Sequence, residues 1–203
     1  MIQALVRRTA LALVALAALA ALVASSAVAT PRRPAVALSP LERGVLAPSA
    51  AAAPRRTASA LSPLEHGVLA DINELRAQHG LPALHLSASL SAAAMAHTRE
   101  MAANGYFEHE SADGTAFWKR IASFYSSQRW SYWAVGENLL YAEPDVDADG
   151  ALQVWLDSPP HRANMLSTKW REIGVAAVHA TAAPGEYHGQ DVTIVTTDFG
   201  VRR

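Results

Sequence analysis

The spacing of apolar residues changes near residue 60, and from there it follows helices and strands. The first helix is predicted by a stripe of apolar residues three or four positions apart: Leu64, Val68, Ile72 and Leu75. Ser62 and Pro63 are typical first residues of a helix, and Glu65 completes a capping box with Ser62. Gly80 is a typical terminator, so we predict a helix that begins after Ser62 and ends before Gly80.

The rest of the chain predicts more helices and then mostly strands. Further helices are expected over 88–104, 116–124 and 146–156, and strands over 137–141, 173–178 and 192–197. Ser87 would cap the second helix, and Asn104-Gly105 would end it. A turn at Pro184-Gly185 lets the last two strands pair antiparallel. This order indicates an α+β fold in which helices flank a small antiparallel sheet.

The N-terminus has the pattern of a secretory signal peptide over residues 1–29. Arg7 and Arg8 precede an apolar run over 10–24, and the small residues Ala27-Val28-Ala29 follow. A membrane anchor is the alternative, but fifteen apolar residues fall short of the roughly 20 that a spanning helix needs. We therefore expect cleavage after Ala29 and a secreted protein, either extracellular or periplasmic.

Residues 30–59 are predicted to be a disordered linker rich in Ala, Pro and Arg. Residues 31–47 and 54–70 are two copies of a 23-residue duplication and share 14 of 17 residues, but only the second copy continues into an amphipathic helix. The linker holds five Arg against one acid, Glu42. It is either a solvated tether or a segment that binds weakly to the anionic envelope.

Charge and cysteine content exclude some classes of protein for residues 60–203. This part has ten Lys and Arg against seventeen Asp and Glu, a net charge of −7. Such a domain has the wrong sign to neutralise phosphates, so we expect no nucleic-acid partner. The chain has no Cys, which excludes a disulfide scaffold.

Polar residues that could perform chemistry lie where predicted elements begin or end. They fall in three segments: Gly105–His109, Gly136–Asn138 and Trp155–Asn164. In the third, Ser158 can cap a short helix that starts with two prolines, which puts His161 in its first turn. The positive end of a helix disfavours a charged imidazole. A neutral imidazole keeps the lone pair that a metal ion requires.

These segments, in their order and spacing, resemble the CAP domain, also called the SCP-like extracellular domain. The matching residues are Ile72–Arg76, Asn104–His109, Gly136–Asn138, Trp155–Asn164, Glu172–Val175 and Asp198–Gly200. The resemblance is to the bacterial branch of a family that includes cysteine-rich secretory and plant pathogenesis-related proteins. It implies a three-layer α-β-α sandwich over residues 60–203, with a central cleft that commonly holds two His and two acidic residues.

The resemblance also assigns residues to that cleft. His109 and His161 take the two histidine positions, which can bind zinc or another divalent cation, and Glu137 takes the first acidic position. The second acid falls near Asp157 or Ser158, and the alignment favours Ser158. Asn138 is expected to line the cleft as well.

Two functions from different classes follow. The first is a secreted binding module for a small hydrophobic or cell-wall ligand, and we favour it over an enzyme. The second is a metal-dependent hydrolase in which His109 and His161 hold the metal and Glu137 is the general base. A third class, an interaction protein held at the envelope by its basic linker, differs from both in depending on residues 30–59.

Several other residues receive structural interpretations. His97 and Glu100, one helical turn apart, are expected to be a surface pair. Trp118, Trp155 and Trp170 are expected in or near the core. The segment 125–133 has more aromatic residues than a loop needs, so it either packs on the domain or forms an apolar lip for a lipid or glycan.

Overall fold

A computed structural model describes residues 61–203, so the predicted signal peptide and linker lie outside the described residues. The helices are α1 (Pro63–Gln78), α2 (Ala88–Asn104), α3 (Phe117–Phe124), α4 (Ala148–Leu156), α5 (Pro159–Met165) and the 3-10 helix η1 (Gly185–Tyr187). The strands are β1 (His85–Leu86), β2 (Trp133–Ala142), β3 (Glu172–Ala180) and β4 (Val192–Arg202). None of the helices in this part of the chain has the length and hydrophobicity needed to cross a membrane.

The four strands form one sheet in the order β1-β3-β4-β2. The three long strands pair antiparallel, as the sequence predicts. The short strand β1 adds two residues that pair parallel with the start of β3, which the sequence analysis did not predict. Strand β2 is an edge of the sheet, so one side of it is open to the loops and helices around it.

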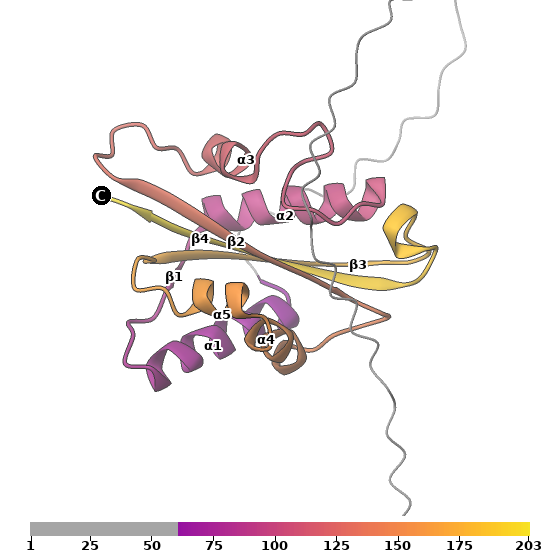
Figure 1. Cartoon of the computed structure of the whole chain (residues 1–203), viewed down its shortest axis with the longest axis horizontal. Helices are drawn as coiled ribbons and strands as arrows, with labels where there is room; N and C mark the ends of the chain where they lie inside the picture. Colours follow the sequence, from indigo (N-terminus) through magenta and orange to yellow (C-terminus); the bar gives the residue numbers. More distant parts are fainter. Residues whose placement is uncertain (1–60) are drawn as a thin grey trace, which may run out of the picture. The chain divides into compact units, whose positions relative to one another are not determined.

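Helices cover both faces of the sheet and confirm the three-layer α-β-α arrangement. Helices α2 and α3 lie on one face, and α1, α4 and α5 lie on the other (Figure 1). Beneath α1 and α4, the core packs Ile72 and Trp155 against Phe199 of β4. On the opposite face, Leu90 and Ile121 form a smaller core.

The expected position of Trp118 is wrong, whereas those of Trp155 and Trp170 are correct. Trp155 and Trp170 are buried at 0% and 3% exposure, but Trp118 is 46% exposed. Helix α3 is short and buries only Arg120 and Ile121, so Trp118 stays on its exposed side.

The predicted capping box at the start of α1 is present. The Ser62 hydroxyl accepts from the Glu65 backbone N–H at 3.3 Å, and the Glu65 carboxylate accepts from the Ser62 N–H at 2.6 Å. The other oxygen of Glu65 accepts from the backbone N–H of Ala177 on β3 at 3.0 Å. One carboxylate therefore both starts α1 and attaches it to the sheet.

Helix α2 lies directly on the sheet and ends as predicted. Gly105 adopts the left-handed conformation, with φ of 68°, that closes a helix without a Cβ penalty. At Gly174 of β3, a Cβ atom would come within 2.1 Å of the Leu90 carbonyl carbon in α2. This contact fixes the height of α2 above the sheet, and therefore the position of the segment that leaves α2 toward His109.

Candidate functional site

The centre of the candidate site is the carboxylate of Glu137 on the edge strand β2. Its side chain is only 1% exposed, and both of its oxygens have partners. The His109 ring donates from Nδ1 to Oε1 at 2.8 Å, and the Arg120 guanidinium donates from Nη2 to Oε2. The His109 side chain is 47% exposed. Its ring therefore faces solvent while it is hydrogen-bonded to the buried carboxylate of Glu137.

Arg120, which the sequence analysis did not single out, links the elements around Glu137. It projects from α3, and its Nη1 donates to the His109 backbone carbonyl at 2.9 Å and to the Ser111 hydroxyl at 3.2 Å. It therefore attaches the segment after α2 to strand β2. The sequence contained one weak signal for the role of Arg120. A buried carboxylate needs a cation, and few Lys and Arg residues lie in the predicted domain.

Asp198 is a second buried carboxyl group beside Glu137 and was also not predicted as a site residue. It lies opposite Glu137 in the β2–β4 pairing and has no exposed surface. Neither of its carboxyl oxygens accepts a hydrogen bond from another group, but a protonated Asp198 can donate one to the Glu137 carboxylate. Burial raises the pKa of Asp198 well above its usual range, and the negative charge of Glu137 raises it further. We therefore treat Asp198 as a neutral acid under the ionised Glu137–Arg120 pair.

His161 lies in the first turn of α5, where the sequence analysis put it. Its Nδ1 is buried and has no hydrogen-bond partner. Burial lowers the pKa of His161, and the nearby imidazole of His109 lowers it further. Both effects favour the neutral form of the His161 ring.

Two asparagines attach α5 to the edge of β2. Asn138, only 1% exposed, donates from its amide to the His161 backbone carbonyl at 3.1 Å. Asn164 donates to the Glu137 backbone carbonyl at 3.2 Å and to the Asn138 side-chain oxygen at 2.9 Å. These amides pair backbone groups at the edge of the sheet and hold the first turn of α5 against β2.

The two candidates for the second acidic position lie apart from this network. Asp157 is exposed at the end of α4, where it accepts a hydrogen bond from Gln153 at 3.3 Å. Ser158 is half-buried at the start of α5 and makes no side-chain capping bond. The acid that does accompany Glu137 is Asp198, which comes from a different strand.

A pocket of about 340 Å³ opens above Glu137. It is lined by His109, Glu110, Phe117, Gly136, Glu137 and Asn164. Its walls therefore come from the segment after α2, from the start of α3, from β2 and from α5. This volume is within the usual range for sites that bind small molecules.

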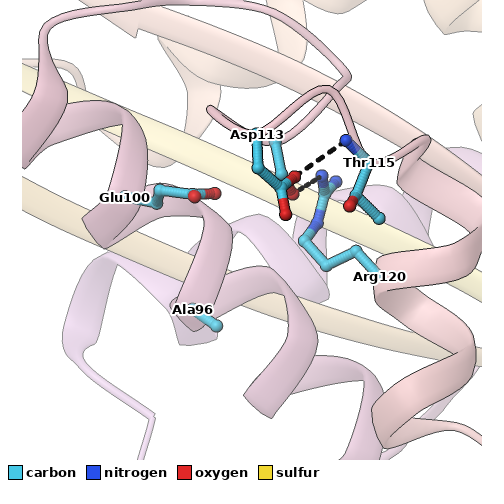
Figure 2. Close-up of a pocket in the computed structure, with 6 residues that line it drawn as sticks. Ala96, Glu100, Asp113, Thr115 and Arg120 are labelled. Carbon is cyan, nitrogen blue, oxygen red and sulfur yellow. Dashed lines mark hydrogen bonds between the residues drawn. The ribbon is translucent and has the colours of Figure 1, made fainter. Parts of the chain in front are cut away.

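A second pocket, of about 430 Å³, is lined by residues of α2, of the segment after it and of α3, among them Arg120 (Figure 2). In Figure 2, Glu100 of α2 lies across this pocket from Asp113 and Thr115. The Arg120 guanidinium points toward Asp113 and Thr115. The Asp113 carboxylate accepts from the Thr115 N–H at 2.8 Å. Arg120 therefore both lines this pocket and bonds to the Glu137 carboxylate.

The expectation of a surface pair at His97 and Glu100 is wrong for His97. Its side chain is fully buried between α2 and the following segment, and burial lowers its pKa. Its Nε2 lies 2.9 Å from the Glu108 backbone carbonyl, and Tyr106 donates to Glu100 at 2.8 Å. His97 therefore supports the backbone immediately before His109.

The two predicted metal ligands, His109 and His161, have no third ligand arranged with them among the described residues. Between residues 61 and 203, no three His, Asp or Glu side chains are arranged to hold a metal ion. Glu137 fixes Nδ1 of His109, which leaves Nε2 free to bind, and His161 is neutral with an unpartnered Nδ1. An ion at this site would thus depend on two imidazoles.

The family model described as "Cysteine-rich secretory protein family", or CAP, matches residues 69–197. Two proteins of Bacillus subtilis are related in sequence. The uncharacterized membrane protein YlbC is 29% identical over 103 residues, which are 51% of this chain and 28% of YlbC. The uncharacterized protein YkwD is 30% identical over 108 residues, which are 53% of this chain and 40% of YkwD. The chain thus matches less than half the length of either relative.

Solved structures agree with this family. An extracellular protein with an SCP domain from Bacillus anthracis is 27% identical, with a TM-score of 0.50, over 71% of this chain and 45% of that one. An outer surface protein of Borrelia burgdorferi shares the fold at 23% identity, with a TM-score of 0.53, over 67% of this chain and 90% of that one. Since the family model spans more than half of the sequence, the chain belongs to the CAP family.

Proposed function

We propose that this protein is an exported binding module that holds a small, partly apolar ligand in the pocket above Glu137. The observation that carries this proposal is the state of Glu137. Its two oxygens are occupied by His109 and Arg120, and its side chain is shielded from solvent. Such a carboxylate orients the His109 ring, and it is poorly placed to take a proton from a substrate.

The lining of the pocket indicates the class of ligand. The Phe117 side chain provides an aromatic wall, and the exposed ring of His109 and the carboxylate of Glu110 provide polar groups. An apolar wall with a few directed polar groups is typical of sites that bind small organic ligands. A small hydrophobic molecule with a polar end, or a short fragment of cell-wall polymer, fits this combination.

Thermal-shift measurements on the protein, with fatty acids and soluble cell-wall fragments as probes, test the binding function. We expect at least one probe class to raise the midpoint of unfolding, and His109→Ala and Phe117→Ala to remove that shift. His179→Ala is the matched control, because the His179 side chain is 45% exposed, close to the 47% of His109. A shift that persists in the His109 and Phe117 variants would reject this pocket as the binding site.

A second candidate function is divalent metal binding by His109 and His161. The observations that favour it are a His161 whose lowered pKa keeps its ring neutral and a His109 whose ring is fixed by a carboxylate. When bound, the ion would polarise a ligand oxygen or activate water. Calorimetric titration with zinc should give weak binding that either His109→Ala or His161→Ala abolishes, and that His179→Ala leaves unchanged. The absence of heat in the folded protein would reduce both imidazoles to parts of the pocket wall.

The metal-dependent hydrolase remains a distinct alternative with its own test. It requires Glu137 to act as a base, so a chelator should abolish hydrolysis, and so should Glu137→Gln when it is assayed at a temperature well below its own unfolding midpoint. In the binding module, Glu137→Gln weakens the support of His109 and lowers ligand affinity, and no hydrolysis is measured in either protein.

A further inference from the structure

The aromatic side chains of α3 and of the segment that follows it are unusually exposed. Between residues 61 and 203, most of the large hydrophobic side chains that face solvent belong to this one region: Trp118, Phe124, Trp130 and Tyr132, at 46%, 42%, 45% and 38% exposure. The remaining two, Leu86 and Val154, belong to other elements. We call residues 118–132 the α3 surface. A large exposed apolar patch is a common feature of interaction sites, whereas single exposed apolar residues are not.

The α3 surface is positively charged within an acidic domain. The sequence has no Asp or Glu between Asp113 and Glu137, but it has Lys119, Arg120 and Arg129 there. Arg120 is paired with Glu137, whereas Lys119 and Arg129 are exposed. At physiological salt, charges more than about 8 Å from a surface are largely screened, so these nearby cations outweigh the distant acids of the domain.

Two further cations at the end of β4 adjoin the same aromatic groups. The Arg202 guanidinium lies 4.1 Å from the centre of the Tyr125 ring and 5.4 Å from that of Trp130. The Arg203 guanidinium lies 4.8 Å from the centre of the Tyr132 ring. Cations and aromatic rings are therefore interleaved here rather than separated into two patches.

The α3 surface is held in place by the sheet. Tyr132 and Arg203 exchange two backbone hydrogen bonds, at 2.8 and 3.0 Å, and the Trp133 indole donates to the Tyr125 carbonyl at 2.9 Å. Figure 1 shows α3 as the outermost element on its side of the sheet, with the following segment beside the end of β4. A binding partner would therefore meet a formed surface.

From these features we propose that the α3 surface docks the protein on an anionic lipid bilayer. Trp and Tyr side chains are favoured at the headgroup level of a membrane, and Lys and Arg near them attract anionic lipids. Arg202 already has a carboxylate partner in Glu172, at 3.7 Å, but a neutral glycan would offer no partner to Lys119 and Arg129. The proposal concerns the outside of the domain and does not depend on what the pocket above Glu137 binds.

Tryptophan fluorescence in the full chain tests this proposal, because all five Trp residues lie at or after Trp118. The signal therefore reports on the folded domain even if the apolar N-terminal segment also meets the lipid. With vesicles of phosphatidylglycerol and brominated phosphatidylcholine, we expect quenching of Trp118 and Trp130. The double variant W118F/W130F should lose most of this quenching, since Trp155 and Trp170 are buried and Trp133 is partly buried. Native emission that brominated lipid does not quench would overturn the proposal.

Charge variants test the lipid selectivity. The double variant K119Q/R129Q should raise the lipid concentration at half-maximal quenching about 25-fold, because each cation near an anionic membrane contributes about a fivefold factor in affinity. Vesicles of phosphatidylcholine alone should give little quenching. Val154→Ser, which changes an equally exposed apolar side chain on α4, is the control and should bind as the native chain does. Equal quenching with neutral and anionic vesicles, or sedimentation with purified cell wall instead of vesicles, would reject an anionic bilayer as the partner.

Discussion

Arg120 and Glu137 form a buried ion pair, with side chains that are 7% and 1% exposed. We expect Arg120→Met to lower the free energy of unfolding by about 3–5 kcal/mol, because it leaves the Glu137 charge buried without its cation. Urea unfolding measures this loss. Lys119→Met, at an exposed position on the same helix, should change stability by less than about 0.5 kcal/mol.

A double variant tests whether the stability lost in Arg120→Met comes from the broken ion pair or from lost packing. Arg120→Met combined with Glu137→Met removes both charges, and we expect it to regain most of the stability lost in the single variant. If the double variant is less stable than Arg120→Met alone, the cost of losing Arg120 comes from its bonds to the His109 and Ser111 segment. That outcome would contradict the ion pair as the main source of stability here.

Asp198 should make the stability of the domain depend on pH in an unusual direction. Its pKa is raised in the folded state, so the folded chain holds a proton at pH values where the unfolded chain has released it. The free energy of unfolding therefore falls as pH rises from the ordinary Asp value, about 3.9, to the folded-state pKa. Asp198→Asn removes this effect, so its stability relative to the native chain should increase by up to about 1.4 kcal/mol per pH unit over that range.

Urea unfolding at a series of pH values measures this difference. Asp157→Asn is the control, because Asp157 is an exposed carboxylate and its substitution should give a difference that does not grow with pH. Curves for the native chain and Asp198→Asn that stay parallel above about pH 4 would show that Asp198 is ionised in the folded protein.

At the residue scale, the sequence predicted the site in part. His109, Glu137 and His161 could be named because they follow element boundaries and match a family pattern. Arg120 and Asp198 could not, since they meet Glu137 only through the packing of α3 and the register between β2 and β4. Sequence spacing within one element carries no information on which residues of two distant strands face one another.

Among the glycines in the sheet, Gly174 on β3 makes the closest contact with a helix, and that helix is α2. Gly174→Ala would put a Cβ atom 2.1 Å from the Leu90 carbonyl carbon, which belongs to the backbone of α2 and cannot turn aside. We expect it to lower the free energy of unfolding by about 3 kcal/mol, at the upper end of the usual cost of overpacking. Thermal or urea unfolding measures this loss.

Gly200→Ala on β4 is a matched comparison for that prediction. Its Cβ atom would lie 2.9 Å from the tip of the Leu90 side chain and 3.0 Å from the Tyr125 ring, both of which are side-chain atoms. A side chain can move by a few tenths of an ångström, so we expect a smaller loss than for Gly174→Ala. Equal losses would mean that α2 shifts as a unit and that Gly174 does not fix its height.

At the element scale, the long helices and strands could be predicted because their boundaries carry specific signals, such as the Ser62 capping box and the left-handed Gly105. Strand β1 could not, because two residues are too short for any periodicity. The burial of His97 could have been predicted from the spacing of apolar residues, because His97 falls on the same side of α2 as Leu90, Ala94 and Met101. Its polarity led to the wrong expectation, because a polar residue on such a stripe can be buried when a backbone carbonyl pairs with it.

At the scale of the whole molecule, charge is distributed unevenly along the chain. This distribution predicts where the protein resides. Residues 60–203 have a net charge of −7, whereas residues 30–59 hold five Arg against Glu42. If both that basic segment and the α3 surface bind anionic lipid, they act as two linked contacts whose joint affinity exceeds that of either. A protein held in this way stays at the envelope after export although no helix within residues 61–203 could anchor it.

Neutralising the basic segment tests this prediction without changing the length of the chain. We expect replacement by Gln of all five of its arginines, Arg32, Arg33, Arg43, Arg55 and Arg56, to shift the protein from the envelope fraction to the medium or soluble fraction. Adding K119Q/R129Q should deplete the envelope fraction further, because the second contact is then weakened as well. Immunoblots of fractionated cells measure the distribution, and an unchanged unfolding midpoint confirms that the domain is intact. Equal retention at the envelope in the variant without the five arginines and in the native chain would show that the basic segment is only a solvated tether. The α3 surface would then be the remaining contact to test.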